Sequence, residues 1–170
     1  VTLELENKGE KARRFDVRFD LVDPHGRIVA QGKTTEYLES LNSGVAEKKF
    51  TIEDPELWSP DHPALYEVNL YLMDQNKLID HVKTMHGIRS ARFDPDQGFL
   101  LNGQKLMMKG VCLHHDGGEL GAAVPLVSWE RRLGLLKELG VNALRLAHNP
   151  HAPEVLDLCD RMGFLVINEM

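Results

Sequence analysis

Residues 107–116 read MMKGVCLHHD, residues 141–150 read VNALRLAHNP and residues 164–169 read FLVINE. Each stretch is a short apolar run that ends in polar side chains able to do chemistry. Helical patterns of the length that parallel strands require lie between the runs. In a parallel β/α array, the carboxyl ends of the strands carry the functional site. The repetition carries the prediction, because any one of these runs alone is a weak signal.

The segments between these runs have helix start and stop signals. Ser128 stands where an N-cap is expected, before an apolar stripe at helical spacing that runs from Trp129 to Leu139. Gly140 is placed as the stop of this helix, Pro153 suits the first turn of the next one, and Gly163 ends it. The order β-α-β-α-β predicts the start of a (β/α)₈ barrel or of an open doubly wound sheet. No Gly-x-Gly-x-x-Gly follows the first strand, which disfavours a dinucleotide site.

The first half of the chain alternates apolar and polar residues with period two, the signature of strands. A tight turn is predicted at residues 23–26, which read DPHG, and about seven short strands without a helical pattern indicate a small β-sandwich of immunoglobulin type. We place this sandwich at residues 1–86 and a truncated TIM-barrel segment of about three βα units at residues 87–170. Trp58 is expected to cover the end of the sandwich core, and a sugar-stacking platform is the alternative. The pair Asn102-Gly103 predicts a hairpin that leads into the second domain.

Composition excludes several classes of function. The chain is 42% apolar and 27% charged, as in ordinary globular proteins, and its net charge of −6 argues against nucleic acid as a partner. No apolar stretch approaches the length of a membrane span, so no membrane partner is expected. Two cysteines in apolar contexts, Cys112 and Cys159, predict buried free thiols, and neither a metal nor another cofactor is expected.

Seven polar residues are predicted to converge at one rim of the parallel sheet. Those after the first strand are His114, His115 and Asp116, those after the second are Arg145, His148 and Asn149, and Glu169 follows the third. Imidazole, guanidinium, amide and carboxylate groups bond sugar hydroxyls with directionality, so a hydroxyl-rich ligand suits this lining. A metal is the competing use of such residues, but the spacings that make a metal site convincing are absent.

Structural roles compete with functional ones at several of these positions. Arg145 can form an ion pair near the barrel bottom, although its place at the end of an apolar strand favours function. Residues 148–151 can simply cap the second helix, a role that His151 fits better than His148 does. His115 is as easily a solvated loop residue.

Several motifs in the same order resemble glycoside hydrolase family 2, the β-galactosidase and β-glucuronidase family. The matching stretches are LWSP at residues 57–60 with LY at 65–66, GIR at 87–89, FLLNGQ at 99–104, KGV at 109–111 with His114, NALR at 142–145 with HNP at 148–150, and LCDRMGFLVINE at 158–169. The resemblance implies an immunoglobulin-like domain, a TIM barrel, and hydrolysis of a terminal β-linked sugar with retention of configuration. It implies further that His114, Arg145 and His148 line the sugar pocket, with Arg145 beside the nucleophilic carboxylate.

Retaining hydrolysis needs two carboxyl groups about 5 Å apart. The resemblance places both catalytic glutamates on later barrel strands, beyond residue 170, so no catalytic residue is assigned in this chain. The pair Asn168-Glu169 looks like the Asn-Glu pair that carries the acid/base, but it ends the third strand rather than the fourth. We therefore interpret Glu169 either as a pocket-floor residue or as a residue that supports the side chains lining the pocket. The family usually has Asp where Asn168 stands, and often Pro or another residue where His151 stands.

A typical barrel takes roughly 250 residues, and far fewer follow the joint here, so we expect a fragment that is inactive alone and forms a homo-oligomer through its open sheet edge. The wording of the loops favours a β-galactoside as the carbohydrate substrate. The compartment stays open between periplasm and cytoplasm. The alternative function is a non-catalytic carbohydrate- or protein-binding sandwich with the βα segment as scaffold. Charged or imidazole side chains at His114, Arg145 and His148 separate the two, because a scaffold does not need them.

Overall fold

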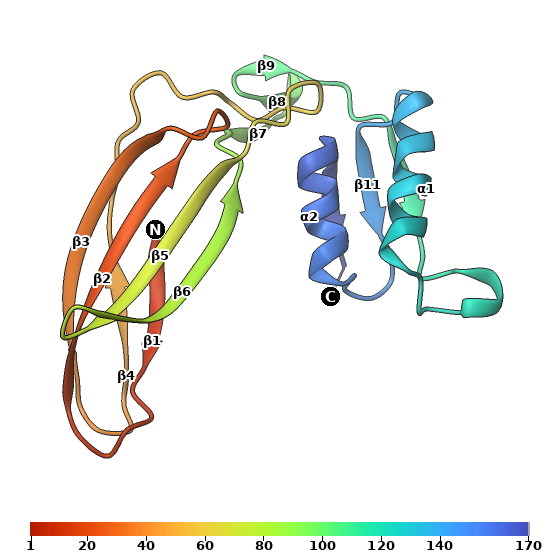
Figure 1. The fold of residues 1–170 in the computed structure, drawn as a ribbon. Helices are drawn as coiled ribbons and strands as arrows, with labels where there is room; N and C mark the ends of the chain where they lie inside the picture. The colour runs from red at the N-terminus through yellow and green to blue at the C-terminus, as the bar shows by residue number, and fades with distance from the viewer. Residues whose placement is uncertain (170) are drawn as a thin grey trace. The chain divides into compact units, whose positions relative to one another are not determined.

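The computed structural model describes residues 1–169, which form two compact units (Figure 1). The first unit contains residues 1–55 and 66–86, and the second contains residues 56–65 together with residues 87 onward. The chain therefore passes from one unit to the other at three points. Within the described residues, no helix has the length and apolar character needed to span a membrane.

The first unit is a β-sandwich of two antiparallel sheets. Its strands are β1 (Thr2–Glu6), β2 (Arg13–Val22), β3 (Ile28–Leu38), β4 (Ser43–Glu47), β5 (Tyr66–Asp74) and β6 (Lys77–His86). One sheet has the order β3-β2-β5-β6, whose long strands lie side by side in Figure 1, and the other pairs β1 with β4. Alternate residues of β2, Phe15, Val17 and Phe19, point into the core because successive side chains of a strand face opposite sides.

Six strands form this unit, not the seven that alternation predicted. The strand β4 ends at Glu47. Phe50 and Ile52 still pack against the core cluster, because an irregular segment can present apolar side chains at the same spacing as a strand. Alternating apolar residues beyond Glu47 are therefore packed against the core without forming a strand.

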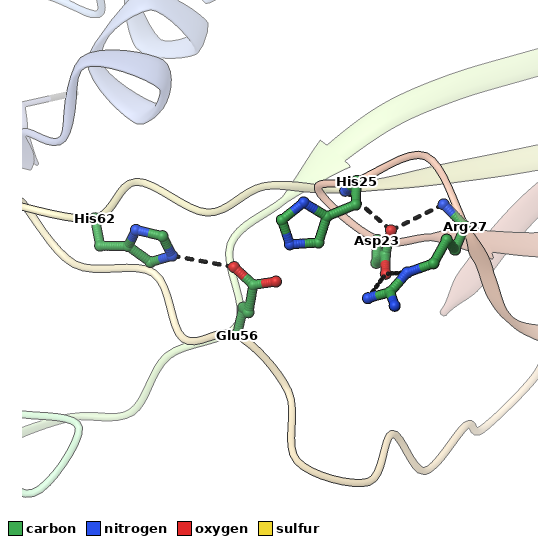
Figure 2. A network of polar contacts seen from close by, with 5 residues as sticks. All are labelled: Asp23, His25, Arg27, Glu56 and His62. Carbon is green, nitrogen blue, oxygen red and sulfur yellow. Dashed lines mark hydrogen bonds and ion pairs between the residues drawn. The ribbon is translucent and has the colours of Figure 1, made fainter.

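The turn between β2 and β3 is held by the buried carboxylate of Asp23 (Figure 2). Its Oδ1 accepts hydrogen bonds from the backbone N–H groups of His25 at 2.9 Å and Arg27 at 2.8 Å, and its Oδ2 accepts one from Arg27 Nε at 2.7 Å. Burial alone would raise the pKa of Asp23, but the Arg27 and His25 donors outweigh it and hold that pKa below its ordinary value. The predicted turn at residues 23–26 is thus confirmed, with Gly26 supplying a φ of 83°.

A small antiparallel sheet opens the main part of the second unit. It contains β7 (Ala91–Asp94), β8 (Gly98–Leu101) and β9 (Gln104–Lys105) in that order. Asn102 and Gly103 connect β8 to β9 with φ values of 52° and 76°, as a two-residue hairpin turn with two left-handed positions requires. The predicted hairpin is therefore confirmed.

A parallel sheet of order β10-β11-β12 follows, with two helices as its crossovers. Its elements are β10 (Gly110–Leu113), the short 3₁₀ helix η1 (Gly118–Leu120), α1 (Leu126–Glu138), β11 (Ala143–Leu146), α2 (Pro153–Met162) and β12 (Leu165–Asn168). Leu144 and Leu146 form one core with Trp129 and Leu133 of α1 and with Leu158 of α2. Both helices therefore cover the same face of the sheet, as right-handed β-α-β connections require.

The predicted helix ends are mostly confirmed. Pro153 is the first residue of α2, and Gly163 ends it in the left-handed conformation with a φ of 74°. The predicted start of α1 is wrong, because the helix begins at Leu126 after Pro125 rather than after Ser128. Pro125 fixes the extended entry, and its carbonyl accepts the Ser128 N–H at 2.9 Å, so Ser128 lies inside the first turn.

Residues 56–65 lie in sequence between two sandwich strands but pack within the second unit. Trp58 is fully buried against Phe99 and Leu101, and its Nε1–H donates to the Asp160 carbonyl at 2.9 Å. The prediction that Trp58 covers the sandwich core is therefore wrong, and a buried ring is no exposed platform for a sugar. Figure 2 also shows the contact of Glu56 with His62 in this segment, at 3.1 Å.

Lys137 of α1 links residues 56–65 to the end of α2 by donating hydrogen bonds to two backbone carbonyl groups. The Lys137 Nζ of α1 donates to the Pro60 carbonyl at 2.9 Å and to the Gly163 carbonyl at 2.8 Å. Its ammonium also lies 4.9 Å from the centre of the Phe164 ring. One side chain thus provides hydrogen bonds for a backbone carbonyl of residues 56–65 and for the carbonyl of the residue that ends α2.

Candidate functional site

The parallel sheet has a covered face and an open face, and Arg145 lies on the open one. Leu144 and Leu146 turn toward the helices, so the residue between them points the opposite way. Parallel pairing puts Cys112 of β10 and Ile167 of β12 in register with Arg145, and both are exposed. This open face and the carboxyl ends of the strands carry the candidate site.

Arg145 is paired with Glu169, the residue that follows β12. Arg145 Nε donates to Glu169 Oε1 at 2.7 Å, and Nη2 contacts the same oxygen. Arg145 Nη1 lies 3.4 Å from Cys112 Sγ. The Cys112 sulfur and the Glu169 carboxylate together raise the pKa of the Arg145 guanidinium above its ordinary value. Three neighbouring strands thus contribute one polar cluster.

Two histidines complete this cluster. His148 Nδ1 lies 3.6 Å from Glu169 Oε2, and the His148 ring lies 5.0 Å from the ring of His114, centre to centre, at 59°. We call His114, Arg145, His148 and Glu169 the rim cluster. The structure therefore brings together four of the predicted site residues, from all three strand ends.

Asp116 and Asn149 make other contacts. Asp116 Oδ1 accepts the Gly118 N–H at 3.0 Å, and its backbone carbonyl accepts a bond from Arg132 Nη2 at 2.8 Å. Asp116 therefore organises its own loop. Asn149 is exposed beside His148, and its carbonyl faces a ring nitrogen of His151 at 3.3 Å.

His151 has a position that its sequence context did not reveal. Its ring is 4% exposed, stacks on His115 at 3.8 Å and meets the edge of Trp129 at 5.2 Å. The expected capping of α2 is wrong, because Ala152 is the N-cap residue and no side chain caps the helix. Burial, with smaller effects of His115 and His114, holds the pKa of His151 below its ordinary value, while the Asn149 carbonyl opposes the shift. The sequence does not predict these contacts, because His115 and Trp129 lie far from His151 along the chain.

The rim cluster offers directional donors and acceptors at a solvent-exposed edge. Arg145 and the two imidazoles can donate, and Glu169 accepts, which suits the paired hydroxyls of a sugar ring. A single carboxylate belongs to the cluster, whereas retaining glycoside hydrolysis uses two. Within residues 1–169, no three His, Cys, Asp or Glu side chains are arranged to hold a metal ion.

The two cysteine thiols are expected to react at very different rates. Cys112 is exposed on the open face, so the prediction that both thiols are buried is wrong for this one. Cys159 is fully buried in α2, and burial together with Asp160 raises its pKa to about 12. Because the thiolate is the reactive form, iodoacetamide should alkylate Cys112 in the folded chain and reach Cys159 only after unfolding. Mass spectrometry of the intact chain checks this, with the unfolded chain as control; rapid double labelling in the folded state would contradict it.

Comparison with family models assigns nearly the whole chain. The model described as glycosyl hydrolases family 2 matches residues 1–89, and the model of the family 2 TIM-barrel domain matches residues 95–170. The chain belongs to glycosyl hydrolases family 2. The resemblance inferred from the motifs is confirmed, and so is the fold class, an immunoglobulin-like sandwich followed by the start of a family 2 TIM barrel.

Relatives within family 2 carry two activity names. The chain is 42% identical to beta-galactosidase BoGH2A of Bacteroides ovatus over 97% of its own length and 19% of that relative, and 41% identical to a beta-glucuronidase of Bacteroides fragilis over 70% of its length and 17% of that relative. The crystal structure of a family 2 member from Bacteroides cellulosilyticus matches 99% of this chain and 23% of that one, with 37% identity and a TM-score of 0.93. The chain thus spans about a fifth of the length of these family 2 proteins.

Proposed function

We propose that the rim cluster is the sugar-binding part of a retaining β-glycosidase. The observation that carries this proposal is the convergence of Arg145, His148 and Glu169 from the ends of two neighbouring parallel strands, with His114 from the third. The carboxyl ends of barrel strands are where TIM-barrel enzymes place their functional residues. Membership of family 2 and the activity names of the relatives support the same conclusion.

Within this proposal, Arg145 orients carboxylates and Glu169 is its partner rather than a catalytic acid. Glu169 Oε1 already receives two Arg145 donors, and Oε2 faces His148. A general acid must present a proton to the leaving oxygen of the substrate, and a carboxylate held in this way is poorly placed to do so. The nucleophile and the acid/base are then supplied by residues outside this chain, and the 170-residue chain alone is inactive.

The substrate that we propose is a terminal β-galactoside. The name of the Bacteroides ovatus relative, which is 42% identical over nearly the whole chain, supports the galactoside, and the beta-glucuronidase names make a glucuronide the competing choice. Homo-oligomerisation and the division at residue 86 stay predictions.

Sugar binding by the 170-residue chain is the test. We expect methyl β-D-galactopyranoside to shift the NMR signals of Arg145 Nε–H and His148 at millimolar concentration. Glu169→Gln removes a charged acceptor, so it should weaken binding roughly tenfold, as loss of one charge-assisted hydrogen bond does. Glu130→Gln, at an exposed carboxylate of α1, is the matched control and should leave binding unchanged.

Hydrolysis of an aryl β-galactoside and an aryl β-glucuronide by the same chain, its mass verified, completes the test. Absence of turnover together with sugar-dependent shifts at the rim cluster is the expected result. Turnover that disappears in Glu169→Gln would make Glu169 a catalytic group and overturn its assignment. Shifts confined to other surfaces, or equal effects of Glu130→Gln and Glu169→Gln, would refute the rim cluster as the binding site.

A further inference from the structure

The His151 ring is a buried polar group that the proposed site does not use. Its Nδ1 faces the Asn149 carbonyl at 3.3 Å, and a carbonyl oxygen can only accept. The contact therefore selects the neutral tautomer with hydrogen on Nδ1, which leaves Nε2 as an acceptor. This Nε2 is buried and has no hydrogen-bond partner among the described residues.

The contacts of His151 join the two loops that present the rim histidines. Through the Asn149 carbonyl, His151 holds the residue next to His148. By ring stacking at 3.8 Å and 23°, it holds His115, the residue next to His114. Trp129 of α1 closes the third side of the ring at 68°. One imidazole thus lies between the α1 surface and the supports of both His114 and His148.

We propose that neutral His151 is the positioning residue of the rim cluster, and that protonation of its Nε2 releases the loop of residues 148–150. Its consequence for sugar binding rests on the proposed function, but the structural role does not. The hydrogen bond and the ring stack of His151 go to Asn149 and His115 rather than to the rim cluster, so it acts through these two residues.

The surroundings of Nε2 explain why the protonated form does not fit. Protonation would turn Nε2 into a buried N–H donor that has no acceptor among the described residues, and would place a positive charge beside the stacked ring of His115. The titratable groups near the ring are His115, which stacks on it, His114, whose charge also acts on it, and Glu154 of α2, which lines the same cavity of about 250 Å³. Two imidazoles therefore lie near the ring against one carboxylate, and the side chain of Glu154 is exposed to solvent.

The direction of the pH effect follows from the lowered pKa of His151. The released loop binds a proton near the ordinary pKa of 6.5, whereas the held loop binds it only at lower pH. The released state therefore binds more protons in that window, so acid favours release. The held arrangement is fully stable above pH 6.5 and weakens as pH falls below that value.

Two variants separate the bond to Asn149 from the ring stack. His151→Asn keeps an N–H donor near the Nδ1 position but does not titrate, while His151→Phe keeps an aromatic ring and loses the donor. Backbone ¹⁵N relaxation of His148 and Asn149, which carry the amide N–H groups of this loop, reports its order, and long-range ¹H–¹⁵N correlation reports the tautomer and titration of His151. His62→Phe, at an exposed histidine of the second unit, is the matched control.

We expect an amide order parameter of about 0.85 for His148 and Asn149 at about pH 7.5, falling below about 0.6 as His151 titrates. In the His151→Phe variant this loop should be mobile both at about pH 7.5 and at the lower pH. In the His151→Asn variant it should stay ordered at both pH values, and the His62→Phe variant should behave as the wild type. A hydrogen on Nε2 at neutral pH, or loop order that does not change while His151 titrates, would overturn the proposal. If His151→Phe fails to fold, the wild-type titration and His151→Asn decide. A loop that switches without sugar-dependent shifts would refute the proposed function alone.

Discussion

Replacing Gly163 with alanine should unfold the second unit, whereas the same replacement at Gly140 should leave it folded. Both glycines follow helices and have positive φ values, 74° and 80°. Alanine in this left-handed conformation costs roughly 1–2 kcal/mol at either position. A Cβ on Gly140 meets nothing within 4 Å, but a Cβ on Gly163 would lie 2.3 Å from the Pro60 carbonyl oxygen. That clash is with backbone, so the total loss at Gly163 should exceed about 4 kcal/mol.

Urea denaturation followed by helical circular dichroism measures this difference. Both α-helices of the described chain lie in the second unit, so the helical signal reports its stability. Gly140→Ala is the control for the left-handed conformation itself. Similar midpoints for the two variants would show that residues 56–65 do not pack against the end of α2 in solution.

Trp58→Ala should destabilise the second unit by about 3–5 kcal/mol, the usual cost of removing a buried Trp side chain. The ring is fully buried against Phe99 and Leu101, its Nε1–H bonds the Asp160 carbonyl, and the Arg89 guanidinium lies 4.4 Å from its centre. Truncation would leave a cavity and remove the hydrogen bond to the Asp160 carbonyl. Phe93→Ala is the control, because Phe93 is 74% exposed although its ring lies 5.0 Å from Phe99; it should cost about 1 kcal/mol.

Amide hydrogen exchange locates the loss. Exchange should accelerate in β11 and α2 and stay unchanged in the sandwich strands β2 and β5. Accelerated exchange confined to β2 and β5 would instead support the original expectation that Trp58 covers the sandwich core.

Local patterns predicted much of the fold. The apolar run that ends in polar residues predicted the strand β11 and placed Arg145 toward its carboxyl end. Pro153 and Gly163 predicted the ends of α2 from backbone preferences alone. Such features depend on residues that are neighbours along the chain, so they can be predicted from the local sequence.

Contacts between distant residues could not be predicted in this way. The partner of Trp58 is the carbonyl of Asp160, 102 residues away, and no local pattern identifies it. The same holds for His151, whose environment comes from Trp129 and His115 on other segments. The rim cluster was predicted as a group because strand ends converge, but its pairs, such as Arg145 with Glu169, depend on register and side-chain direction.

The place of residues 56–65 has a consequence for recombination between relatives. The sandwich is a discontinuous module, since residues 1–55 and 66–86 build it while the intervening loop belongs to the other unit. A chimera cut once after residue 86 would import a foreign Trp58 segment into a native Phe99 and Leu101 pocket. A graft that replaces residues 1–55 and 66–86 but keeps residues 56–65 would preserve that pocket. Exchange of sandwiches between family 2 proteins should therefore succeed as a two-segment graft more often than as a single crossover.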